Sequence, residues 1–86
     1  MRLDKFLKVS RIIKRRTVAN EACDSARVSA NGRPVKASYQ VKIGDILEIA
    51  FGNSNLKLEV LKLNEQAKKD DASENYRVIS RSGAEE

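Results

Sequence analysis

The stretch RLDKFLKVSRIIKRRT, residues 2–17, contains the first regular apolar pattern of the chain and its densest positive charge. Three apolar residues recur at the i, i+3, i+4 spacing of one helical face: Leu3, Phe6 and Leu7. This spacing predicts a short helix over residues 2–9. The following SRIIK breaks it, because the two isoleucines cannot both share that face. We therefore expect a turn over residues 10–14 and a second helix after it.

The positive charge of the chain is concentrated in the same stretch. It holds seven basic residues against one acidic residue, whereas the whole chain has 17 basic and 12 acidic residues. The remainder is therefore close to neutral. A local cluster of Lys and Arg repels itself unless a polyanion offsets it, so the pattern favours an anionic partner. Nucleic acid, anionic lipid and an acidic protein all fit this observation.

Length and composition favour binding over catalysis. A chain of 86 residues forms one small domain with a modest core. It has no histidine and a single cysteine, so imidazole chemistry and a structural zinc site are excluded. The carboxylates show no pairing suited to acid–base work. We expect no catalytic residues, no metal, no cofactor and no enzymatic activity.

The chain also lacks the patterns of membrane insertion and secretion. Its apolar runs are far shorter than the roughly 18–20 residues that a spanning helix needs, and Met1 is not followed by an apolar signal segment. One cysteine allows no internal disulfide, which gives an oxidising compartment no support. We expect a cytoplasmic protein without membrane contact.

The second helix is predicted over about residues 15–25, which are rich in alanine and contain neither Gly nor Pro. Its apolar stripe is expected to consist of Val18, Ala22 and either Ala19 or Cys23. We expect Cys23 to be a small buried hydrophobe. Arg15 and Arg16 stand at the beginning of this helix, where cations oppose the helix dipole. A phosphate shared between the guanidinium groups and the helix amides would account for them.

The rest of the chain reads as strands joined by turns. Asn31-Gly32 predicts a tight hairpin, and Pro34 belongs at a sheet edge just after it. Further turns are expected at Gly44-Asp45 and within residues 51–55. The predicted strands cover residues 46–51, with Phe51 in the core, and 56–63, with a bulge near Val60-Leu61. A polar loop over residues 64–75, a last strand at 76–80 and a solvated tail complete the pattern.

This order predicts an α+β fold, with two N-terminal helices packed on a small, mainly antiparallel twisted sheet and a short C-terminal extension. The successive segments RLDKFL, SRIIKRRTVANEA, RVSANGRPVK and VKIGDILEI agree with the S4 RNA-binding domain in order and spacing. The chain is similar to this family over roughly residues 1–50. It departs from the family pattern where Ser25-Ala26 replaces the glycine that usually precedes the first strand.

The S4 resemblance, together with the short length, points to the small stand-alone S4 proteins of bacteria. Among these, the chain resembles the RqcP family of ribosome-associated quality control factors and, less closely, the heat-shock-associated recycling factors. We expect an S4 domain over residues 1–63, and over 64–86 a polar loop, the last strand and a flexible tail.

The resemblance implies a set of partners. They are the dissociated large ribosomal subunit with its 23S rRNA, the P-site peptidyl-tRNA that it carries, and RqcH, whose C-terminal alanine tailing of stalled chains the factor would support. We expect it to act as a monomer. The alternatives are a general rRNA-binding assembly or recycling factor, and a basic interaction module that docks an acidic protein.

The candidate RNA-binding residues lie mostly in the opening stretch. They are Arg2, Asp4, Lys5, Lys8, Arg11, Lys14, Arg15 and Arg16, with Arg33 and Lys36 flanking the hairpin tip. A cationic face suits RNA because RNA helices present phosphates and 2′-hydroxyls more readily than base edges. The alternative is that these basic residues form a solvated face whose charges serve only solubility. We expect base stacking to contribute little, with Tyr39 and Tyr76 as its only candidates, because Phe6 and Phe51 are assigned to the core.

Asp4 is the exception in a cationic stretch. The simplest interpretation is an ion pair that orients Arg11 or Arg16. The alternative is that its carboxylate accepts a hydrogen bond from a 2′-hydroxyl or a base edge, which would help to tell RNA from DNA.

Overall fold

The computed structural model describes residues 1–51, 54–64 and 72–83. The elements follow the chain as α1 (Leu3–Val9), α2 (Arg16–Asp24), β1 (Val28–Ala30), β2 (Arg33–Pro34), β3 (Ile46–Phe51), β4 (Ser54–Val60), the 3₁₀ helix η1 (Ala72–Asn75) and β5 (Tyr76–Gly83). The strands form one antiparallel sheet in the order β2-β1-β3-β4-β5. The α+β fold with two N-terminal helices is confirmed.

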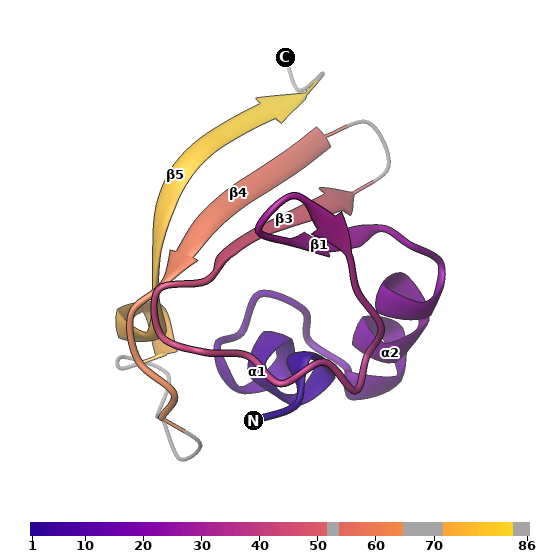
Figure 1. The fold of residues 1–86 in the computed structure, drawn as a ribbon, viewed down its shortest axis with the longest axis horizontal. Coiled ribbons are helices and arrows are strands. Elements are labelled where there is room, and N and C mark those ends of the chain that lie inside the picture. Colours follow the sequence, from indigo (N-terminus) through magenta and orange to yellow (C-terminus); the bar gives the residue numbers. More distant parts are fainter. Residues whose placement is uncertain (52–53, 65–71, 84–86) are drawn as a thin grey trace.

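The core lies between the helices and one face of the sheet. Leu3, Phe6 and Leu7 of α1 are fully buried, as their spacing predicts. In β3 and β4 the buried side chains alternate with exposed ones, so the sheet has one covered face and one open face. Figure 1 shows both helices gathered beneath β1 and β3, while β5 forms the far edge of the sheet. This arrangement presents the N-terminal helix pair at one end of the molecule.

The hairpin between β1 and β2 forms where Asn31-Gly32 predicts it. Both residues have positive φ, 54° and 86°, as a tight type I′ turn requires. The Asn31 side chain also fastens the hairpin to β3, because its Oδ1 accepts the Ile46 amide at 3.0 Å and its Nδ2 donates to Asp45 at 3.1 Å. Pro34 lies on the edge strand β2, as expected.

Both helices end in the same way, with a residue in the left-handed conformation where glycine is usual. After α1, the amides of Arg11 and Ile12 donate back to the carbonyls of Lys8 and Leu7 at 3.0 Å each. Arg11 has φ 59°. After α2, Ala26 takes the corresponding place with φ 62°. These are Schellman caps, so the missing glycine changes the residue at the cap and not the geometry.

Replacing Ala26 by glycine is expected to stabilise the fold by about 0.5–1 kcal/mol, because glycine carries no Cβ penalty at positive φ. Chemical denaturation followed by circular dichroism measures the change. The matched control is Ala22→Gly, within α2, which should destabilise the protein by about 1 kcal/mol. A loss of stability in Ala26→Gly would contradict the cap assignment.

Two apolar residues do not lie where we expected them. Val18 is 47% exposed, whereas Ala19 and Cys23 are fully buried and Ala22 packs against the core. The buried stripe of α2 is thus turned by one residue from the expected one. Full burial of Cys23 confirms this residue as a buried hydrophobe, and burial raises the pKa of its thiol to about 11. Phe51 is 39% exposed at the end of β3, so its assignment to the core is wrong.

The second half of the chain differs from expectation in three places. β4 ends at Val60, so Leu61 and Leu63 do not continue the strand and no bulge lies there. The irregularity instead lies between Lys57 and Leu58 in the pairing of β4 with β5. The expected loop ends in η1, and the expected last strand lies within the longer β5. Residues 52–53, 65–71 and 84–86, which belong to the expected turn, loop and tail, lie outside the described residues.

Candidate nucleic-acid interface

The structure places the basic residues of the opening stretch on the helix pair and its connecting turn. Arg2 is the N-cap of α1, and Lys5 and Lys8 follow it at i+3 intervals, so they continue along the same side of the helix. Arg15 is the N-cap of α2 and Arg16 is its first residue. Arg11 and Lys14 lie in the turn between the helices. Among these seven residues, Lys5 is half-buried. The other six are exposed, namely Arg2, Lys8, Arg11, Lys14, Arg15 and Arg16.

Asp4 holds the two helices and two of these cations together. Its side chain is only 3% exposed, whereas those of Arg2 and Arg16 are about half exposed. Arg2 donates to both carboxylate oxygens, at 3.2 and 3.3 Å, and the Arg16 Nε lies 3.4 Å from Oδ2. Asn20 of α2 donates to the same Oδ2 at 3.3 Å, and the Lys5 amide donates to Oδ1 at 2.8 Å. One buried carboxylate therefore fixes guanidinium groups from both helices.

The ion-pair interpretation of Asp4 is thus right for Arg16 and wrong for Arg11. The reason is geometric, because Arg11 lies in the left-handed cap beyond the far end of α1. Arg2, which we did not expect as a partner, precedes α1, and its side chain reaches forward to Asp4 in the first turn. Thr17 and Asn20 were also missed. They line, with Asp4 and Arg16, a hollow of about 330 Å³. The i, i+4 spacing of Arg16 and Asn20 was the available signal.

The surroundings of Asp4 determine its protonation. Burial acts to raise the pKa of this carboxyl group, but hydrogen bonds from Asn20, Arg2 and Arg16 and the charge of Arg16 outweigh burial and lower the pKa below its usual value. The carboxylate is therefore charged at neutral pH. This charge keeps the two arginines oriented while their outer faces remain open to a ligand.

The lowered pKa of Asp4 predicts an acid-dependent stability. A carboxyl group whose pKa is lower in the folded state stabilises the fold above its unfolded pKa, and the contribution is lost as the pH falls through the folded value. The free energy of unfolding should therefore decline as the pH drops below about 4. In Asp4→Asn this decline should be shallower, as measured by urea titrations between about pH 2 and 6. An unchanged slope would contradict the assignment. Asp45, whose pKa is also lowered, supplies the residual slope.

The two basic residues near the hairpin are placed differently. Lys36 precedes Ala37, whose carbonyl accepts the Asp4 amide at 3.3 Å, so this segment runs beside the start of α1. Lys36 can therefore extend the cationic surface. Arg33 belongs to the edge strand β2, and within the described residues it forms no hydrogen bond or ion pair with Asp4. The structure brings Lys36 toward the helix pair and leaves Arg33 at the sheet edge.

The tyrosines contribute more to the fold than to a stacking surface. The Tyr39 hydroxyl donates to Asp45 at 2.7 Å, and this hydrogen bond, with burial and the Asp45 charge, raises the pKa of Tyr39. Tyr39 and Tyr76 are both half-buried and pack against the core. Half-buried rings packed in this way leave little free face for stacking on a base.

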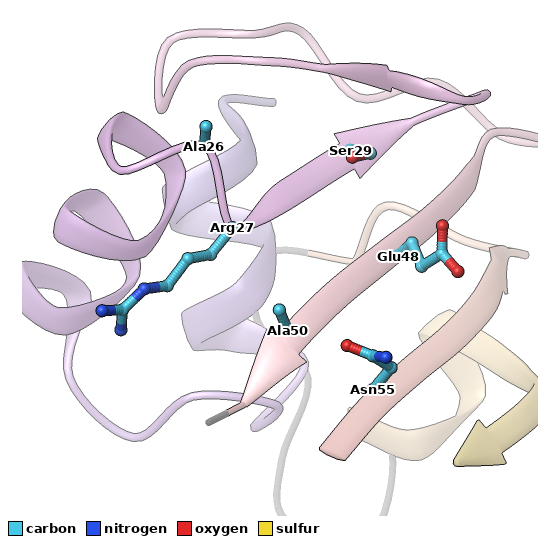
Figure 2. A pocket seen from close by; sticks show the side chains of 6 residues that line it. All are labelled: Ala26, Arg27, Ser29, Glu48, Ala50 and Asn55. Carbon is cyan, nitrogen blue, oxygen red and sulfur yellow. The ribbon is translucent and has the colours of Figure 1, made fainter. Parts of the chain in front are cut away.

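A second hollow, of about 280 Å³, lies on the open face of the sheet (Figure 2). It is lined by Ala26, Arg27, Ser29, Glu48, Ala50 and Asn55. Figure 2 shows the Arg27 side chain pointing away from Glu48 and Asn55. Since this hollow carries charges of both signs on exposed side chains, it does not extend the cationic surface.

Comparison with known protein families and structures gives concordant results. The family model described as "S4 domain" matches residues 1–47. A protein of Streptococcus pneumoniae named "RQC P-site tRNA stabilizing factor" is 51% identical over 100% of this chain and 98% of its own length. A protein of the same name from Bacillus subtilis is 49% identical over 92% of each chain.

A solved structure shows the same fold. It is described as the trimeric structure of Heat Shock Protein 15 from Vibrio cholerae, with a TM-score of 0.86 and 28% identity. The match covers 93% of this chain and 82% of that one. Separately, none of the helices in the described ranges has the length and apolar character that crossing a membrane requires.

Proposed function

This chain belongs to the S4 domain family, and from that membership we propose that it is a non-enzymatic RNA-binding factor of ribosome-associated protein quality control. It acts in the cytoplasm, as one copy, on the dissociated large ribosomal subunit that carries peptidyl-tRNA. It contacts 23S rRNA and the P-site tRNA. The relatives named for stabilising a P-site tRNA support this role, since they match over nearly the whole chain.

The single observation that carries the proposal is the arrangement around Asp4. A buried carboxylate holds Arg2 and Arg16, from the two helices, with their guanidinium groups half exposed. Arginines held in this way can meet phosphate oxygens with little further loss of conformational freedom. The adjoining hollow, with the amide of Asn20 and the hydroxyl of Thr17, offers polar groups to a ribose. A surface that served only solubility would not need this fixed geometry.

The beginning of α2 supports phosphate binding at the same place. Its N-cap, Arg15, makes no side-chain capping bond. The first amides of a helix have no partner within the helix, and their dipole favours an anion. A phosphate placed there would accept from these amides while it pairs with Arg15 and Arg16. The same phosphate would offset the unfavourable position of two cations at a helix N-terminus.

Arg11 supports the proposal through its backbone. A residue other than glycine in the left-handed region costs about 1–2 kcal/mol, and such strain is often found at functional sites. Glycine would form the same cap without this cost. We attribute the arginine to a contact that its exposed side chain makes with RNA.

The finer role follows from the same resemblance. Bound beside the P-site tRNA, the factor would support RqcH during alanine tailing of the stalled chain by keeping the tRNA in place. To hold the tRNA on the subunit more tightly, the factor must contact the tRNA and the subunit at the same time. The helix pair and the segment that carries Lys36 provide neighbouring basic surfaces for two RNA elements.

The experiment for this proposal is the capture of the tagged chain from a bacterial lysate, with and without ribonuclease. We expect large-subunit rRNA, tRNA and RqcH to be recovered together, and all three to be lost after ribonuclease treatment. Recovery of an acidic protein that persists after ribonuclease would contradict RNA binding and favour the interaction module. Recovery of both ribosomal subunits in equal amounts, without RqcH, would favour a general assembly or recycling factor.

A further inference from the structure

Asn75, at the junction of η1 and β5, is buried against the turn that follows α1. Its side chain is fully buried, and its Nδ2 donates to the Ser10 hydroxyl at 3.1 Å and to the Asn64 carbonyl at 3.2 Å. The backbone carbonyl of Asn75 accepts the amides of Leu61 and Lys62 at 2.8 and 3.2 Å. The C-terminal part of the chain is therefore attached to residue 10, which lies 65 positions earlier in the sequence.

Ser10 occupies a decisive position in that turn. It is the C-cap of α1 and is only 1% exposed, and its amide donates to the Phe6 carbonyl at 3.0 Å. The next residue is Arg11, with φ 59°. Ser10 is thus the last residue before the one whose backbone is strained and whose side chain is proposed to meet RNA.

A strained backbone persists only where its surroundings leave it no relaxed alternative. Three restraints act on Arg11: the two Schellman hydrogen bonds, the buried side chain of Ile13, and the attachment of Ser10 to Asn75. The first is local and is shared with the cap at Ala26. Among the residues that the structure describes, the Ser10–Asn75 hydrogen bond is the only side-chain hydrogen bond between this turn and the C-terminal segment.

We propose that Asn75 is a positioning residue for RNA binding, which acts through Ser10 to keep Arg11 in its left-handed conformation and its guanidinium group directed at the RNA. This inference rests on the proposed function and goes beyond it, because it gives the C-terminal segment a part in RNA affinity without any contact to RNA. Without the Asn75 amide, the turn is free to relax, and the guanidinium group must be ordered again each time RNA binds.

The test compares Asn75→Ala and Ser10→Ala, each alone and in the Arg11→Ala background. Affinity is measured on purified large subunits carrying P-site tRNA, at a temperature where circular dichroism shows every variant to be folded. We expect each single substitution to weaken binding about three- to tenfold. In the Arg11→Ala background neither should weaken it further, because no guanidinium group remains to be misplaced. Ile49→Val, a core change in β3 that removes one buried methyl group and touches neither the turn residues nor the Ser10–Asn75 hydrogen bond, should leave affinity unchanged.

The outcomes separate this inference from the proposed function. Normal affinity in Asn75→Ala and Ser10→Ala, beside a weakened Arg11→Ala, overturns the positioning role alone. Equal losses in the two backgrounds overturn it as well, because Asn75 would then act on binding by another route. If Asn75→Ala does not fold, Ser10→Ala decides, since it removes the same hydrogen bond from the other side. Failure of the unchanged chain to bind the subunits contradicts the proposed function itself.

Discussion

Leu7→Ala is expected to lower the free energy of unfolding by about 2–5 kcal/mol, the largest effect of any single change considered for this chain. Leu7 is fully buried in the layer between α1 and the sheet. Its truncation removes apolar contacts and leaves a cavity that neighbouring helices close only in part. Its carbonyl also accepts the amides of Ile12 and Ile13, at 3.0 and 3.1 Å, so a shift of α1 would disturb the turn that follows.

A small domain has only about 5–15 kcal/mol of stability at most, so Leu7→Ala should leave a measurable unfolded fraction at moderate temperature. Urea denaturation followed by far-ultraviolet circular dichroism gives the value. Val18→Ala is the matched control, because Val18 is an apolar residue of the helix pair that lies 47% exposed. Its effect should stay within about 0.5–1 kcal/mol. Similar losses in the two variants would mean that the core does not lie where we place it.

Arg16→Ala is expected to weaken binding to large subunits by about 1–3 kcal/mol while the fold persists. The side chain is half exposed, so its removal opens no cavity. What is lost is a guanidinium group that Asp4 holds at 3.4 Å in front of the hollow beside α2. The loss should include a shallower salt dependence, because one phosphate contact fewer releases about one counterion fewer.

The control for Arg16→Ala is Arg81→Ala, which removes the same side chain from the exposed strand β5. Net charge changes equally in the two variants, so a general electrostatic attraction would weaken both alike. We expect Arg81→Ala to retain the affinity of the unchanged chain within about twofold. Affinity measured over a salt series separates the two results. Equal losses would contradict a defined binding site on the helix pair.

Local patterns predicted the parts of the fold that local interactions determine. The i, i+3, i+4 spacing of Leu3, Phe6 and Leu7 identified α1 and its buried face. The turn chemistry of Asn31-Gly32 identified the hairpin, because positive φ at two successive residues leaves few other conformations. The order of the elements, two helices followed by a run of antiparallel strands, predicted the packing of the helix pair on the sheet.

The errors arose where packing between distant segments decides. α2 is short and rich in small residues, so several stripes were compatible with its sequence, and packing in the folded protein buries Ala19 and Cys23 rather than Val18. Phe51 follows the alternation of β3 but ends up 39% exposed. The bulge lies in the pairing of β4 with β5, whose register no local pattern fixes.

The basic residues of the candidate site were predicted from the sequence, but their arrangement around Asp4 was predicted only in part. The density of basic residues located the surface, because charge clustering is visible in sequence. The partners of Asp4 were not fully predicted. Asn20 reaches it only because α2 packs on α1, and Arg2 reaches it through the local geometry of the α1 N-terminus. The link from Asn75 to Ser10 joins residues 65 positions apart, and such a contact leaves no trace in a single sequence.

Sedimentation of the tagged chain with purified ribosomal particles tests the central claim most directly. The particles are large subunits with P-site peptidyl-tRNA, large subunits without it, and complete ribosomes, each offered to the unchanged chain and to Arg16→Ala. We predict that the unchanged chain sediments preferentially with the tRNA-occupied large subunit and that Arg16→Ala loses this preference. Equal binding to every particle and to bare RNA, unaffected by Arg16→Ala, would contradict a specific role at the P-site tRNA.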